Sequence, residues 1–92
     1  MIVRVLHDNQ YRLESKYLDE LNDLDNRMVA VVNTGDEQGF HRLLDEMIGL
    51  VKGKGEELSQ YEIATSDVIL PSQDLTIQEA QKLFVGQGVV PG

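Results

Sequence analysis

The sequence predicts an α+β fold, with an N-terminal β-hairpin and a short third strand packed on an antiparallel pair of helices, and a small C-terminal helix. Three observations favour this fold. β-Branched and aromatic residues alternate with polar ones within residues 2–14, as in strands. Two segments with apolar residues at helical spacing follow, separated only by residues 34–37. A short apolar run then ends at Pro71 and precedes a helix-capping motif.

The hairpin is predicted from two apolar segments, residues 2–6 and 11–14, that flank a turn-forming stretch. We place its loop at residues 8–10, with Asn9 as the residue that takes a positive φ angle. One face of the hairpin then collects four apolar side chains, those of Val3, Val5, Tyr11 and Leu13.

The loop length decides the register of the hairpin. A two-residue loop places Val5 opposite Arg12 and mixes apolar and charged side chains on one face. A three-residue loop places Val5 opposite Leu13 instead. It also brings Arg4 opposite Glu14 as a cross-strand ion pair. We therefore predict the three-residue loop, because it gives one face that can be fully buried.

A first helix is predicted over Lys16–Asn33, with Ser15 as its N-cap and Gly35 as its left-handed stop. Its apolar stripe consists of Tyr17, Leu21, Leu24, Met28 and Val31. Its outer side carries the acidic residues Asp19, Glu20, Asp23 and Asp25.

A second helix is predicted to begin after Asp36, which serves as its N-cap, and to end at Gly53 and Gly55. The connection is so short that the two helices must be antiparallel neighbours. Gly39 and Gly49 lie inside this helix, where we expect them to allow a close helix crossing. Its apolar stripe consists of Phe40, Leu43, Leu44, Met47, Leu50 and Val51.

The C-terminal half is predicted to add one strand and one helix. Residues 56–65 form a polar connection anchored by Leu58, Tyr61 and Ile63. Residues 67–71 form a short strand that joins the hairpin, because a lone hairpin is marginal in water. Thr76 and Glu79 form a capping box for a helix over Ile77–Phe84. The inward-facing residues of that helix are Ile77, Ala80, Leu83 and Phe84.

Composition narrows the functional classes. The 92 residues predict one domain spanning 1–92, with a formal net charge of -8 and no cysteine. An acidic domain is badly placed for binding nucleic acid or anionic lipid. The absence of cysteine excludes disulfides and thiolate chemistry. No segment has the length of a membrane span or the pattern of a signal peptide, so we expect a cytoplasmic protein that does not insert into the membrane.

No catalytic, cofactor-binding or metal-binding residue is predicted. His7 and Asp8 are adjacent in sequence, and strand neighbours point to opposite faces. His41 is the only other imidazole, and no Glu-x-x-His pattern supports a carboxylate metal site. Gly53–Gly55 lacks the spacing of a phosphate-binding loop. These observations favour a binding module over an enzyme.

The apolar stripes are wider than one helix–helix seam requires. Tyr17, Val32, Ile48 and Leu50 add a second flank, which a partner helix would need. The C-terminal tail, with Val89, Val90 and Pro91, either docks on its own domain or adds to another chain. The predicted partner-binding residues are Val32, Ile48, Val89, Val90 and Pro91. The alternatives are stripes that only complete the core, and a homodimer built through the helices or a sheet edge.

Several motifs occur in a characteristic order along the whole chain. They are Met1–Arg4, Gln10-Tyr11, Leu21–Asp25, Gly35–Glu37 with Phe40, Gly55 with Leu58, Ser66–Pro71, Asp74 with Thr76, and Gly88–Gly92. This set resembles the PspA-associated protein family (PspAA) of the phage-shock membrane-stress systems. The turn at residues 7–9 departs from the glycine-rich turn of that family.

The resemblance implies a non-enzymatic accessory of PspA, a coiled-coil membrane-remodelling protein, in maintenance of the cell envelope. It implies no cofactor and supplies no catalytic residue. On this basis we expect an adaptor or regulator that binds a PspA-like coiled coil and reaches the membrane only through that partner. The alternative is a self-assembling homodimer without a dedicated PspA contact.

Overall fold

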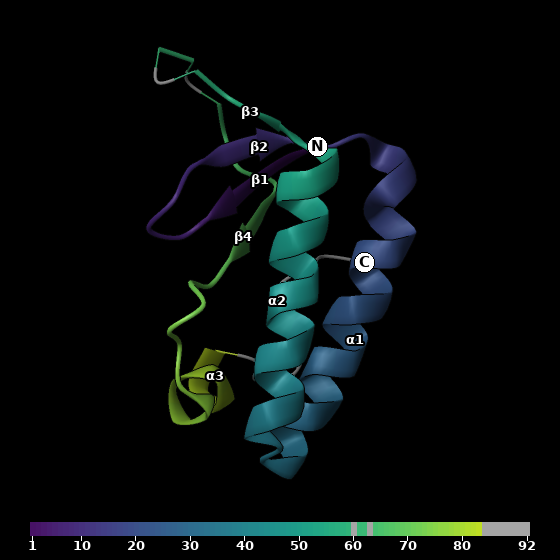
Figure 1. Ribbon diagram of the computed structural model, residues 1–92, viewed down its shortest axis with the longest axis vertical. Coiled ribbons are helices and arrows are strands. Elements are labelled where there is room, and N and C mark those ends of the chain that lie inside the picture. The colour runs from purple at the N-terminus through teal and green to yellow at the C-terminus, as the bar shows by residue number, and fades with distance from the viewer. Residues whose placement is uncertain (60, 63, 84–92) are drawn as a thin grey trace.

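The computed structural model describes residues 1–59, 61–62 and 64–83 and confirms the predicted α+β fold (Figure 1). Two long helices lie side by side, with the sheet at one end and a small helix at the other (Figure 1). The elements are β1 (Ile2–Val5), β2 (Gln10–Arg12), η1 (Ser15–Tyr17), α1 (Leu18–Thr34), α2 (Glu37–Lys54), β3 (Glu56–Glu57), β4 (Val68–Leu70) and α3 (Ile77–Leu83).

The sheet has the strand order β3-β2-β1-β4. β1 pairs with β2 in the antiparallel sense and with β4 in the parallel sense. The third strand predicted at residues 67–71 therefore joins the hairpin as expected. The inner face of the sheet, with Leu13 directly after β2, contributes six buried side chains to the core: Val3, Val5, Tyr11, Leu13, Val68 and Leu70.

The register of the hairpin differs from the prediction. The cross-strand partners are Ile2–Arg12, Val3–Tyr11 and Arg4–Gln10. Leu13 lies beside Met1, to whose carbonyl its N–H donates at 2.9 Å, so its predicted pairing with Val5 is wrong. The predicted ion pair between Arg4 and Glu14 is also wrong. The predicted buried face is nevertheless correct. The observed register is shifted from the predicted one by an even number of residues, and side chains alternate between the two faces with a period of two.

The turn of the hairpin explains this slip. The N–H of Asp8 donates to the carbonyl oxygen of Val5 at 3.0 Å, which closes a tight turn. His7 takes the positive φ angle of 65°, so the assignment of that conformation to Asn9 is wrong. Histidine tolerates the left-handed region better than most residues do. The Oδ1 atom of Asn9 instead accepts a hydrogen bond from the N–H of Gln10 at 2.8 Å.

One strand was missing from the prediction. β3 pairs with β2 in the antiparallel sense and consists of two exposed glutamates, Glu56 and Glu57. Glutamate is depleted in strands, so the sequence gives no strand pattern here. Charged side chains on an edge strand do suit its position, because they discourage pairing with another chain.

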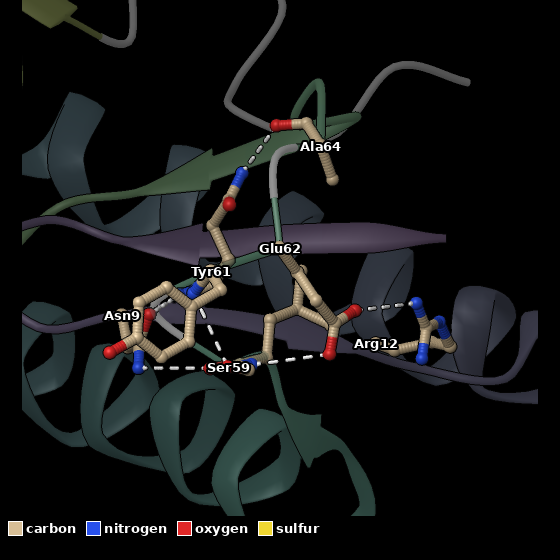
Figure 2. Close-up of polar contacts among 8 residues, drawn as sticks. Asn9, Arg12, Ser59, Tyr61, Glu62 and Ala64 are labelled. Atoms are coloured by element: carbon tan, nitrogen blue, oxygen red, sulfur yellow. Dashed lines mark hydrogen bonds and ion pairs between the residues drawn. The ribbon is translucent and has the colours of Figure 1, made fainter.

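The loop after β3 is held against the sheet by polar contacts (Figure 2). The Glu62 carboxylate accepts from the N–H of Ser59 at 3.3 Å and from Arg12 at 3.2 Å. The side-chain amide of Gln10 donates to the carbonyl of Ala64 at 2.8 Å. Of the three predicted anchors, Leu58 is buried, as expected. Tyr61 is 85% exposed, so its prediction as an anchor is wrong. Ile63 lies outside the described residues.

The first long helix begins later than predicted. Ser15 starts the short 3-10 helix η1 and makes no side-chain cap, so its predicted role is wrong. At the other end, Gly35 has φ 75° and stops α1, as predicted. Asp25, predicted on the outer side, is only 1% exposed, so this position is also wrong.

The second long helix begins as predicted, because the Asp36 carboxylate accepts from the N–H of Gly39 at 3.0 Å. It runs through Gly53 to Lys54 before Gly55 ends it. The two interior glycines do not mark a helix crossing. A Cβ at Gly39 would meet the Asp36 side chain, and one at Gly49 would meet nothing within 4 Å.

The last helix is capped as predicted. The Thr76 hydroxyl accepts from the N–H of Glu79 at 3.1 Å, and the Glu79 carboxylate accepts from the N–H of Thr76 at 3.2 Å. Gln81 donates to the carbonyl of Val32 at 3.3 Å, which ties α3 to the end of α1. Ile77 and Ala80 are buried as predicted. The other two predicted core residues are not described in full: the structure describes only the backbone of Leu83, and Phe84 lies outside the described residues.

Candidate partner-binding site

The structure places the predicted partner-binding residues in two groups. Val32 is 1% exposed and Ile48 is 3% exposed, and both belong to the core. A partner can contact these two side chains only if the elements covering them move away. The tail residues Val89, Val90 and Pro91 lie outside the described residues. Their contacts, like those of Val32 and Ile48, stay predictions.

A surface groove lies between α1 and α2, close to the turn that joins them. Its cavity volume is about 430 Å³. Its lining residues, which we call the outer groove, are Arg27, Ala30, Val31, Asp36, Gly39, Arg42, Leu43 and Glu46. All of them belong to α1, α2 or the connecting turn, so neither the sheet nor α3 forms a wall. The outer groove is therefore the side of the helix pair that these elements leave open.

The floor of the outer groove is apolar. Val31 and Leu43 are partly buried there and pack against the core. Ala30 on α1 is exposed and carries only a methyl group, and Gly39 on α2 is buried beneath the Asp36 side chain. Val31 and Leu43 belong to the predicted apolar stripes, where helical spacing alone does not distinguish them from fully buried neighbours. The signal for the groove is the small residue Ala30 on the exposed side of α1.

Charged side chains of both signs form the rim. The Arg27 guanidinium lies 3.1 Å from the Asp23 carboxylate, one turn earlier on α1. Asp36 is engaged as the cap of α2. Arg42 and Glu46 are exposed and make no ion pair with any residue that the structure describes. The rim thus offers one cation and one anion to a partner.

A second cavity of about 290 Å³ lies between the hairpin turn, α2 and the connection from β4 to α3. Its ionisable groups already serve the fold. Lys52 forms an ion pair with Asp8, to which the Tyr11 hydroxyl also donates at 3.3 Å. The hydrogen bond from Lys52 lowers the pKa of Asp8, and the same bond raises the pKa of Lys52. This cluster ties the hairpin turn to the last turn of α2.

The ion pair between Asp8 and Lys52 predicts a defined response to acid. Because the pKa of Asp8 is lower in the folded chain than its usual 3.8, the pair stabilises the fold above pH 3.8 and loses this effect as the pH falls through the lowered value. Asp8→Asn removes this dependence. The urea midpoint should therefore fall by more between pH 7 and pH 3 in the parent than in Asp8→Asn. Equal losses in both proteins would contradict the assignment.

The described residues lack two features that other functions would require. No cluster of three or more His, Asp or Glu side chains there is placed to hold a metal ion. Within the same residues, no helix has the length and apolar character needed to cross a membrane.

Comparison with known proteins gives one family. No match was found among the curated proteins or among the solved structures. A family model described as PspA-Associated protein, PspAA, matches residues 1–92. The match covers the whole chain, from the hairpin to the C-terminal tail. The resemblance in the ordered motifs is thereby confirmed, and the chain belongs to the PspA-associated protein family.

Proposed function

We propose that this protein is a non-enzymatic adaptor or regulator of the phage-shock envelope-stress response that binds the PspA coiled coil. The observation that carries the proposal is the family match over residues 1–92. In this proposal the protein is cytoplasmic and reaches the membrane only through its partner. The proposed contacts are a helix surface and the tail residues Val89, Val90 and Pro91.

Physical features of the chain support a binding role. A chain of 92 residues has a thin core, so a deep substrate cleft would remove much of the packing that holds it together. The outer groove lies at the surface between α1 and α2 and has an apolar floor, which suits contact with a protein surface. The ionisable cluster at the hairpin turn is already occupied by contacts within the fold.

The direct test is a calorimetric titration of the full chain with the PspA protein encoded by the same genome. We expect saturable binding, and weaker binding by a chain that lacks residues 86–92. Circular dichroism of both chains provides the control for folding. Unchanged affinity after truncation would remove the tail from the proposal. Absence of binding by the full chain would reject the adaptor role.

The exposed edge of the sheet favours a second candidate, a homodimer formed by strand addition. β4 is the last strand of the sheet, and Ile69 on it is 50% exposed. Leu6, in the turn that follows β1, is 40% exposed. Light scattering over a dilution series separates the two candidates. A dimer that persists at low micromolar concentration, together with no PspA binding, would favour the homodimer.

A further inference from the structure

We propose that the outer groove takes one amphipathic helix of the coiled-coil partner, which lies along α1 and α2 as a third helix. Its aliphatic side chains would contact Val31 and Leu43, and an acidic side chain would contact Arg42. This inference rests on the proposed function, because it names the surface that serves it and the chemistry of the segment bound there.

The shape of the groove favours a helix. A third helix can pack along the seam of two antiparallel helices at a crossing angle near 20°, as in helical bundles. Such packing requires the backbones to approach closely. Ala30 permits this approach on the α1 side, because it places only a methyl group at the exposed surface, whereas the Asp36 side chain covers Gly39 on the α2 side. Aliphatic side chains of the partner then fill the space above Val31 and Leu43.

Charge fixes the chemistry of the partner helix. Arg42 lies on the rim without an ion pair among the described residues, whereas the neighbouring Arg27 is held by Asp23. An acidic side chain beside the aliphatic stripe of the partner would pair with Arg42. A basic side chain on the opposite flank would pair with Glu46, which is also unpaired in the described chain. The two contacts together would set the direction of the bound helix.

Net charge argues against a second copy of this chain as the occupant. Each copy carries a formal net charge of -8, so two copies repel one another over the whole surface. The chain has sixteen acidic and eight basic residues, and the outer groove contains two of those bases. A partner helix with mixed charge satisfies the local rim without bringing another strongly acidic domain close.

Full-length variants titrated with PspA test the proposal. Ala30→Glu places a charged chain on the floor at an exposed helical position, and Arg42→Glu reverses the rim charge. We expect each substitution to raise the dissociation constant about tenfold or more. Two controls make the same kinds of change outside the groove. Lys82→Glu reverses a charge on α3, and Ile69→Asp adds a charge at the sheet edge. We expect both controls to bind within about twofold of the parent.

The outcomes separate the inference from the proposed function. Parent-like binding by both groove variants would overturn the groove assignment and leave the adaptor role standing. Loss of binding in Ile69→Asp alone would place the contact at the sheet edge, which also overturns it. A dimer that dissociates in Ala30→Glu would make a second copy the occupant. Circular dichroism and thermal melting confirm that each variant is folded before it is titrated.

Discussion

Replacing Leu44 with alanine should lower the free energy of unfolding by about 2–5 kcal/mol. Leu44 lies on α2, is 0% exposed and belongs to the core that joins the helices to the sheet. Its truncation leaves a cavity that the surrounding side chains fill only in part. A small domain has about 5–15 kcal/mol of stability in total, so this change removes a large share of it.

Urea denaturation followed by circular dichroism measures this loss. Leu50→Ala on the same helix is the matched control, because Leu50 is only partly buried and its truncation opens less cavity. We expect a clearly smaller change in the urea midpoint for the control. If Leu44→Ala unfolds at the same urea concentration as the parent, the core assigned to α2 is wrong.

The second large effect is expected at Gly55, where α2 ends against the sheet. A Cβ atom at this position would clash with the carbonyl oxygen of Val51 and would lie 3.2 Å from the Cβ of Tyr11. Since the first of these neighbours is backbone, the end of the helix or the strand must shift. Gly55→Ala should therefore destabilise the fold by about 1–3 kcal/mol, the usual range for an overpacked site.

Gly53 provides a control with the opposite sign. It lies inside α2, two residues earlier, and a Cβ there would meet nothing within 4 Å. Alanine has the higher helix propensity, so Gly53→Ala should stabilise the protein by up to about 1 kcal/mol. Thermal melts of the two variants then move in opposite directions. Two shifts of the same sign would show that the space around Gly55 does not decide the effect.

Periodicity was sufficient to predict the main elements and their buried faces. The stripe positions Leu21, Met28 and Met47 are buried, and other stripe positions, such as Val31 and Leu43, are partly buried against the core. Local capping chemistry was also predictable, since Gly35 and Asp36 act within one helical turn of their own positions. These features depend on neighbouring residues alone, and a single sequence contains that information.

The errors share a different cause. The hairpin register depends on a turn in which His7, a residue with a side chain, takes the conformation more usual for glycine. β3 forms because Glu56 and Glu57 are carried beside β2 by the end of α2, and their own residue type does not favour a strand. Asp25 is buried by its place in the tertiary structure. None of these effects can be derived from spacing along the chain.

The open flank of the helix pair could not be located from the sequence. The wide apolar stripes indicated an additional surface on the helix pair, and Val32 and Ile48 were chosen for it. Both are core residues in the structure. Which flank stays open depends on where the sheet and α3 pack. That packing leaves Val31 and Leu43 on the open side.

The most direct test of the adaptor account is a residue-level map of the PspA contact. Amide chemical shifts of the isotope-labelled chain would be recorded while unlabelled PspA is added. We predict that the largest changes fall on the outer groove, at Ala30, Val31, Gly39 and Leu43. Spectra that remain unchanged at saturating PspA would contradict the account.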